Sequence, residues 1–174
     1  KVIESYKNLL PIDIDIDAYI PMGYIPNEFQ KLDIYKRIAG IETEEESEEI
    51  LEELIDRFGD LPKSVENLLS IAKIKTMAHR AYFTEVAQKG ETLKFTLYEK
   101  AKIDVAKIPE FVASYGNNLK FAADAKAPYF TYFLKKNSRE KSVDALEILE
   151  KFLASAGEVL LFPEKKEENM TVKN

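Results

Sequence analysis

The spacing of apolar residues changes near Tyr82, and this change divides the chain into two parts that must fold differently. Before Tyr82 the apolar residues recur at intervals of three and four, which is the period of one helix face. After it they alternate with polar residues, for example over residues 93–97, which is the period of a half-buried strand. The pattern predicts an α+β domain in which helices dominate the first part and a sheet forms in the second.

The first part begins with an alternating segment and continues with three predicted helices. Isoleucines at 12, 14 and 16 alternate with aspartates at 13, 15 and 17, which predicts a strand running to about Ile20. The signals that bound the helices are Asn27 and Gly40 for the first, the capping box of Thr43 with Glu46 and then Gly59 for the second, and Pro62 and Ala81 for the third. The apolar positions expected to line these helices are Phe29, Leu32, Tyr35 and Ile38 in the first and Ile50, Leu51, Leu54, Ile55 and Phe58 in the second.

The second part predicts a β-β-α-β-β-α unit. Strands are expected near residues 83–86, 93–97, 119–123 and 129–134, and helices are expected to open at Asp104 and at Ser138 or Ser142. This order predicts a four-stranded, largely antiparallel sheet with two helices on one face. We expect residues 1–11 to be the end of an upstream segment, residues 12–162 to form the domain itself, and residues 163–174 to be a disordered tail.

Composition argues against several classes of function. The 174 residues include no cysteine and a single histidine, His79, so disulfides, thiolate metal sites and multi-histidine metal sites are excluded. No glycine pattern for phosphate binding occurs, and no apolar run approaches the ~20 residues that span a bilayer. The formal net charge of -6 opposes binding to a nucleic-acid backbone. We therefore expect a cytoplasmic, non-catalytic protein-binding domain that holds no metal or cofactor.

Two alternative functions rest on particular charged residues. Asp13, Asp15 and Asp17 would share one strand face, as a cation site or the acids of a hydrolase would require. A charged outer face that resists pairing with other strands explains the same pattern. Lys73, Lys75 and Arg80 on the third helix could form a small basic stripe for nucleic acid despite the net charge.

Short motifs in the first two helices carry a family resemblance. The sequence Tyr-Lys-Arg-Ile at 35–38 is followed by Glu-Leu-Ile-Asp-Arg-Phe-Gly at 53–59 and by Leu-Pro at 61–62. This order resembles the C-terminal domain of bacterial transcription-repair coupling factors, specifically over residues 12–81 and at the level of pattern over residues 82–162. The resemblance implies that the parent protein is an ATP-driven DNA translocase, whose site for ATP and Mg²⁺ lies outside this chain. It also implies that residues 1–11 are a linker from the upstream motor domain.

The resemblance also implies a partner and a set of contact residues. In the family this domain docks on a UvrB-like N-terminal module of the same protein and covers the surface that would bind UvrA. It releases that surface when the motor engages a stalled RNA polymerase. The matching motif positions place Glu53, Asp56 and Arg57 at the interface, with Glu49 and Glu52 beside them. The parent is expected to contact RNA polymerase and DNA, whereas no membrane or direct nucleic-acid contact is expected for this domain.

Structural roles for the same residues remain open from the sequence. Glu53 and Arg57 are four residues apart on one helix, so they can pair with each other, which is worth ~0.3–0.5 kcal/mol. Arg57 could instead hold the turn at Gly59, and the acidic run over residues 44–53 could be a solvated helix face. The alternative function is a protein-docking module that recruits a partner directly, without masking a surface.

Overall fold

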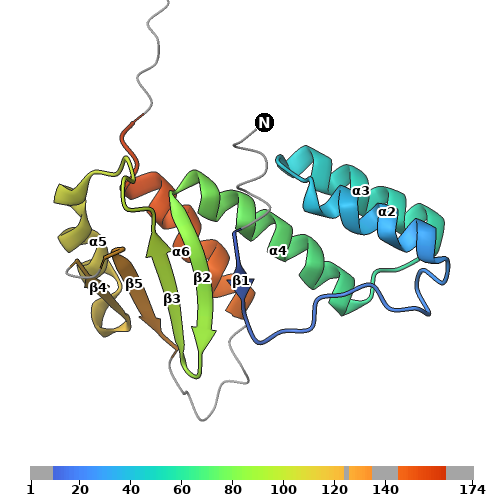
Figure 1. The fold of residues 1–174 in the computed structure, drawn as a ribbon, viewed down its shortest axis with the longest axis horizontal. Coiled ribbons are helices and arrows are strands. Elements are labelled where there is room, and N and C mark those ends of the chain that lie inside the picture. The colour runs from blue at the N-terminus through green and yellow to red at the C-terminus, as the bar shows by residue number, and fades with distance from the viewer. Residues whose placement is uncertain (1–9, 124–125, 135–144, 164–174) are drawn as a thin grey trace, which may run out of the picture.

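The structure is a computed structural model that describes residues 10–123, 126–134 and 145–163 (Figure 1). Its elements are, in chain order, β1 (Ile12–Asp13), α2 (Glu28–Ala39), α3 (Glu44–Phe58), α4 (Lys63–Arg80), β2 (Phe83–Lys89), β3 (Thr92–Leu97), the 3-10 turn η1 (Val105–Lys107), α5 (Ile108–Ser114), the 3-10 turn η2 (Gly116–Asn118), β4 (Leu119–Ala122), β5 (Tyr129–Phe133) and α6 (Ala145–Val159). This order confirms the predicted α+β class, with an N-terminal strand and three helices before a β-β-α-β-β-α unit.

The strands form one five-stranded sheet in the order β1-β2-β3-β5-β4. Strands β2, β3, β5 and β4 pair antiparallel with their neighbours, and the short β1 adds to β2 in parallel. The β2–β3 hairpin turns at Gly90, whose φ of 58° lies in the left-handed region that glycine adopts without steric cost. The predicted antiparallel sheet of four strands is therefore present and is extended by a fifth strand from the start of the chain.

Helix α4 connects two hydrophobic cores. Its C-terminal half contributes Ile74 and Ala78 to a core formed with the sheet, α5 and α6. Its N-terminal half contributes Val65 and Leu69 to a second core formed with α2 and α3. Figure 1 shows α4 running from the α2–α3 pair to the sheet, next to α6. Because both cores share this helix, its packing fixes how α3 is placed relative to the sheet.

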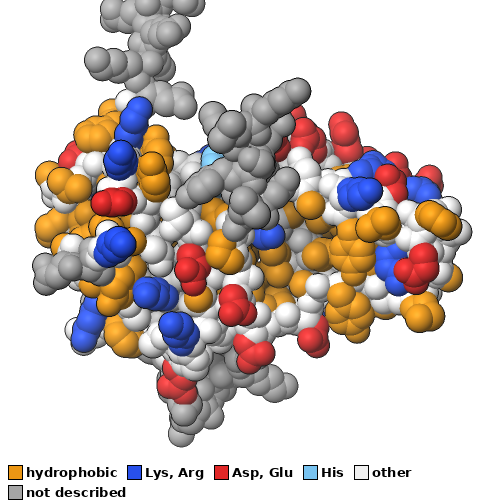
Figure 2. Space-filling model, viewed as in Figure 1, with side chains coloured by type: hydrophobic (Ala, Val, Ile, Leu, Met, Phe, Trp, Pro, Cys, Tyr) orange, Lys and Arg blue, Asp and Glu red, His pale blue; other side chains and the backbone are white. Residues whose placement is uncertain are grey.

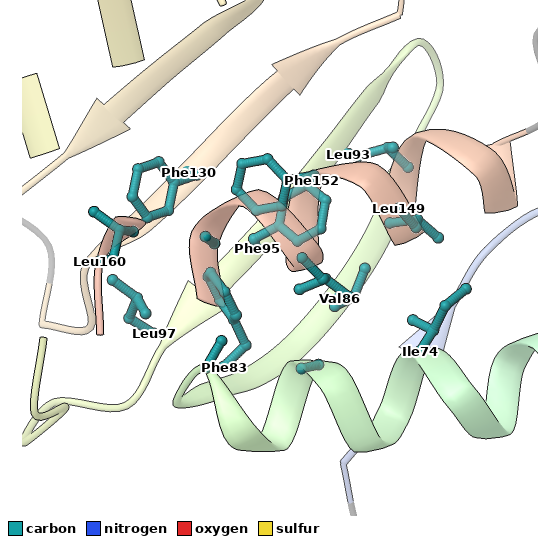
Figure 3. Packing of buried hydrophobic residues seen from close by; sticks show 14 of the residues in the cluster. Ile74, Phe83, Val86, Leu93, Phe95, Leu97, Phe130, Leu149, Phe152 and Leu160 are labelled. Atoms are coloured by element: carbon teal, nitrogen blue, oxygen red, sulfur yellow. The ribbon is translucent and has the colours of Figure 1, made fainter. Parts of the chain in front are cut away.

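The sheet core is centred on Phe152 of α6, which is 1% exposed. The ring centroid of Phe152 lies 4.0 Å from that of Phe95 and 5.7 Å from that of Phe130. Figure 3 shows these rings between α6 and the strands, with Val86 and Leu149 nearby. Such aromatic contacts add to the burial of apolar area, so they hold α6 firmly on one face of the sheet.

The predicted strand from residue 12 to about residue 20 is wrong in length. Only Ile12 and Asp13 pair with β2, at Val86 and Ala87. The backbone bends after them, since the Ile16 N–H donates to the Ile14 carbonyl oxygen at 3.0 Å. Ile14 and Ile16 still pack against the sheet core, so the alternation marked a half-buried segment and not a continuous ladder.

Two apolar residues of α2 and one of α3 do not face the core as their spacing suggested. Phe29 is 85% exposed, Leu32 is 53% exposed and Ile55 is 46% exposed. The buried stripe of α2 is instead formed by Ile34 and Ile38, which lie four residues apart. Helices α2 and α3 contact each other and α4, and the apolar residues that point away from these contacts stay exposed.

Some sequence predictions fall outside the described residues. These are the caps proposed at Ser138 and Ser142, most of the linker at 1–11, and all but the first residue of the tail at 163–174. At the end of the proposed linker, Leu10 is 3% exposed in the sheet core. The Pro11 carbonyl oxygen accepts a hydrogen bond from the Val86 N–H at 3.1 Å.

Candidate functional site

Helix α3 carries all five predicted interface residues, and both of its ends are fixed. The Thr43 hydroxyl accepts a hydrogen bond from the Glu46 N–H at 3.2 Å. The Glu46 carboxylate accepts one from the Glu42 N–H at 2.8 Å, one residue earlier than in a capping box. At the other end Gly59 has a φ of 89°, which lets the chain turn away at a place where a larger residue would be strained.

Glu53 connects α3 to α2 through two arginines. Its Oε2 atom accepts hydrogen bonds from the Nη1 of Arg37 on α2 and, at 3.2 Å, from the Nη1 of Arg57 one turn along α3. The hydrogen bond from Arg37 is the main reason why the pKa of Glu53 lies below its ordinary value, and Arg57 adds to the effect. The same hydrogen bond raises the pKa of Arg37. The Glu53 carboxylate is therefore held in place by arginines from both helices of the α2–α3 pair.

The pairing of Glu53 with Arg57 is one of the alternatives that the helical spacing left open. The pairing with Arg37 was not predicted, although Arg37 belongs to the motif at 35–38. The two residues are 16 positions apart, and no periodicity along one helix reports on a contact between two helices. An arginine in the last turn of one helix and a glutamate on the facing helix were the only signals in the sequence.

Glu49, Glu52 and Asp56 lie on the outer side of α3. All three are exposed, and within the described residues none of them forms an ion pair. Together with Glu53 they stand at i, i+3, i+4 and i+7, which is one face of a helix. Ile55 is next to them and is 46% exposed. The outer side of α3 thus combines three carboxylates that pair with no described residue and one apolar side chain, Ile55, and we call these four residues the α3 docking face.

Arg57 and Tyr24 make contacts at the C-terminal end of α3, next to this face. The Arg57 guanidinium lies 4.9 Å from the ring centroid of Phe58, a cation–π distance. The Tyr24 hydroxyl points at two carbonyl oxygens of the helix end, 3.1 Å from that of Leu54 and 2.9 Å from that of Gly59. Burial, and secondarily the charge of Asp60, raise the pKa of Tyr24, so its hydroxyl stays a donor near neutral pH. These contacts limit the motion of the C-terminal turn.

The residues of the two alternative functions, the aspartates of a cation or hydrolase site and the basic residues of a nucleic-acid stripe, do not form the sites that their spacing in the sequence suggested. Asp13, Asp15 and Asp17 are exposed, and the described ranges hold no group of three or more metal-ligating side chains placed to bind an ion. Lys73 and Arg80 lie on the α3 side of α4, where Lys73 is 3.7 Å from Glu44 and Arg80 donates to the Glu42 carbonyl oxygen.

Lys75 does not join Lys73 and Arg80 in a single basic stripe. Two residues along a helix correspond to about 200° of rotation, which separates Lys75 from Lys73. Lys75 instead borders an apolar depression between α2 and α4, together with Tyr35, Ile38 and Ile71. A continuous basic stripe on α4 is therefore absent from this helix.

Carboxylates arranged as on the α3 docking face suit recognition of a basic surface. Each can accept two hydrogen bonds from one guanidinium, and Ile55 can be desolvated at the same time. Figure 2 shows acidic side chains along the edge of the molecule where α3 runs. Fold and surface together define the class: an α+β domain whose helical unit and sheet share one long helix, and whose outer helix presents a charged face.

Comparison with known proteins gives the family. The family model described as "TRCF domain" matches residues 14–108, and the chain belongs to this family. It is 34% identical over 137 residues to the transcription-repair-coupling factor of Bacillus subtilis strain 168, covering 78% of this chain and 12% of that protein. It is 43% identical over 90 residues to that of Staphylococcus haemolyticus strain JCSC1435, covering 52% of this chain and 8% of the relative.

A solved structure shares the fold. It is titled "Crystal structure of C-terminal domain of transcription-repair coupling factor", and it matches with a TM-score of 0.71 and 31% sequence identity. The match covers 86% of this chain and 92% of the solved chain, so it includes the sheet as well as the helices. The resemblance stated from the motifs at 35–38 and 53–59 is confirmed. In the part of the chain that the structure describes, no helix is long and apolar enough to cross a membrane.

Proposed function

We propose that this domain is a non-catalytic, autoinhibitory docking module of a transcription-repair coupling factor. It docks on the UvrB-like N-terminal module of its parent and masks the surface that UvrA would bind. Engagement of a stalled RNA polymerase by the translocase releases it. The observation that carries the proposal is the α3 docking face, on which Glu49, Glu52 and Asp56 are exposed and unpaired within the described residues.

The geometry supports a division of roles within the family motif. Glu53 is already paired with Arg37 and Arg57, so its first role is to hold α3 on α2. Asp56 and Glu52, which lack such partners in the described residues, are the carboxylates available to arginines of another module. Arg57 can keep its contact with Glu53 and still offer other donor atoms to a partner, because a guanidinium has five N–H groups.

The energy required of this contact is modest. Holding the domain closed at 99:1 takes about 2.7 kcal/mol, half of what a shift from 1:99 to 99:1 needs. Interfaces between domains of one chain bury ~600–1,500 Å² and resemble transient protein contacts. A few desolvated charge pairs around one apolar residue can supply that energy, and an interaction of this size can be displaced when the parent binds its target.

A calorimetric titration of this chain with the N-terminal module of its parent tests the proposal. We expect binding that weakens with salt, and a loss of affinity of about ten-fold or more in Glu52→Gln/Asp56→Asn, since buried interfacial charge pairs couple by ~1.5 kcal/mol or more. The control variant Glu99→Gln/Glu110→Gln removes the same charge from exposed residues of the sheet half and should bind normally. Absence of binding at low salt would contradict the proposal.

Competition separates masking from the alternative of direct recruitment. If the domain masks, it competes with UvrA for the N-terminal module, and the Glu52→Gln/Asp56→Asn variant of the full-length parent binds UvrA more tightly. If the domain recruits a partner directly, UvrA binding is unchanged and the same substitutions weaken capture of that partner. In both cases the variant must show the circular dichroism of the wild-type domain.

A further inference from the structure

The sheet has a face that α4, α5 and α6 do not cover. The strand registers place the side chains of Thr92, Lys94 and Thr96 on this face, opposite the buried Leu93, Phe95 and Leu97. Residues of β5 and β4 in register with them continue the same face. At its centre lie five residues that we call the basic–aromatic patch: Lys94, Lys120, Tyr129, Thr131 and Phe133.

The patch has a regular internal arrangement. Thr131 on β5 is in register with Lys94 on one side and with Lys120 on the other. The Lys94 ammonium leans toward one end of β5 and lies 4.4 Å from the ring centroid of Tyr129. The Lys120 ammonium leans toward the other end and lies 5.4 Å from the centroid of Phe133. Two cation–aromatic pairs therefore flank a small polar side chain on a flat surface.

Charge is distributed unevenly across this sheet face. Asp13 and Glu85 lie on it at the side of β1 and β2, with Lys89 at the hairpin end of β2. Along β3, β5 and β4 the open face carries lysines, threonines and aromatic residues and no acid. Neither Lys94 nor Lys120 forms an ion pair with another described residue. Figure 2 shows the same division, with basic side chains over the β3–β4 side and acidic ones over β1.

We propose that the basic–aromatic patch binds single-stranded nucleic acid. Bases that are not paired stack on aromatic rings, and ammonium groups beside those rings contact the phosphates. An antiparallel sheet with aromatic residues on its open face is a known platform for this mode of binding. Here Tyr129 and Phe133 supply the rings, Lys94 and Lys120 supply the cations, and the short Thr131 leaves room between them.

The geometry is less suited to an acidic peptide or to a duplex. A peptide gains most from a sheet when it adds a strand at the edge, whereas both rings are on β5, which has a strand paired on each side. Such a peptide would also leave the two rings without a role. A duplex is read by a helix or a two-stranded ribbon that enters a groove, and the open face of a multi-stranded sheet is too broad to enter one.

The net charge of -6 weakens this binding but does not exclude it. Acids are concentrated on α3, which packs on the other core of the domain. Two phosphate contacts predict a slope near 1.4 for the logarithm of Kd against the logarithm of salt, from the value of ~0.7 per contact for single strands. We expect a Kd in the range of about 10⁻⁴ to 10⁻⁶ M, typical of binding without sequence preference.

Fluorescence anisotropy with a labelled oligothymidylate of about 12 nucleotides, within the range covered by single-strand binding folds, tests the proposal. Tyr129→Leu and Phe133→Leu should each weaken binding about five-fold or more, because one stacked base is lost. Lys94→Gln/Lys120→Gln should abolish most of the salt dependence. Lys36→Gln/Lys63→Gln removes the same charge from exposed residues of the helical half and should bind as the wild type does.

The proposal would be overturned by no binding at low salt, by normal binding of both ring variants, or by equal binding of the duplex form. A poly-glutamate peptide that competes fully, while the ring variants behave normally, would identify the patch as a site for acidic protein and would equally overturn it. If a ring variant fails to fold, Thr131→Glu places a negative charge at the half-buried centre of the patch. This variant should lose binding and keep the wild-type circular dichroism.

Discussion

Arg37 of α2 and Glu53 of α3 form an ion pair that joins the two helices on which the family motifs lie. Arg57 binds the same carboxylate oxygen at 3.2 Å, so one glutamate holds two arginines. Motif positions 37, 53 and 57 are therefore neighbours in space. The family motifs in this part of the chain therefore include residues that hold two helices together as well as residues on a surface. We call the ion pairs of Glu53 with Arg37 and Arg57 the brace.

The brace should contribute measurably to stability. Arg37→Met and Glu53→Gln are each expected to lower the free energy of unfolding by about 1 kcal/mol or less, because both side chains remain more than a third exposed and solvent screens the pair. A double-mutant cycle by urea denaturation should give a coupling energy that shows the two side chains stabilise the folded domain together. Glu52→Gln, one position away and exposed, is the control and should change stability little. Additivity of the two substitutions would contradict the brace.

The contribution of Glu53 should depend on pH in the acid range. Its hydrogen bond from Arg37 keeps the pKa below the ordinary value of 4.5, so the unfolded chain takes up this proton at a higher pH than the folded domain does. The stabilisation is complete above the unfolded pKa and is lost as pH falls through the folded pKa. The difference in unfolding free energy between wild type and Glu53→Gln should therefore be largest near neutral pH and shrink below 4.5. A difference that grows on acidification would contradict this assignment.

Tyr24 should act as a tether for the C-terminal end of α3. Tyr24→Phe keeps the ring, whose centroid lies 5.8 Å from that of Phe58, and removes only the hydroxyl that points at Leu54 and Gly59. We expect a loss of about 1 kcal/mol of stability, the usual net value of one hydrogen bond. In this variant, hydrogen exchange at the last turn of α3 should speed up relative to the wild type, and exchange in α6 should change less. An equal change of the exchange rate in both helices would show that the hydroxyl has no local role.

Buried and exposed apolar residues should respond very differently to truncation. Phe152 is 1% exposed among the rings of Phe95 and Phe130, so Phe152→Ala should cost about 3–5 kcal/mol. Ile55 is 46% exposed, so Ile55→Ala should change stability by about 0.5 kcal/mol or less. Thermal unfolding of the two variants checks both values. A large loss in Ile55→Ala would restore the expectation that this residue belongs to the core.

The order of elements was predictable because it depends on local patterns. Asn27 caps α2 as expected, accepting hydrogen bonds from the Phe29 and Gln30 N–H groups at 3.0 Å. The alternation over residues 93–97 became β3 with Leu93, Phe95 and Leu97 buried. The failures occurred where local pattern was insufficient. The isoleucines at 14 and 16 are half-buried without forming a strand, and Phe29 lies at the margin of its helix.

The sequence by itself determined the α+β class, the succession of helices and strands, and the family, since each rests on periodicity, caps or motifs within short segments. Only the tertiary structure decided which carboxylates of α3 are paired and which are exposed, and that Lys94 and Lys120 gather with two rings on one open face. The physical reason is that an ion pair or a patch depends on distances between elements. Those distances are set by how both cores pack on α4, and spacing along the chain carries no record of them.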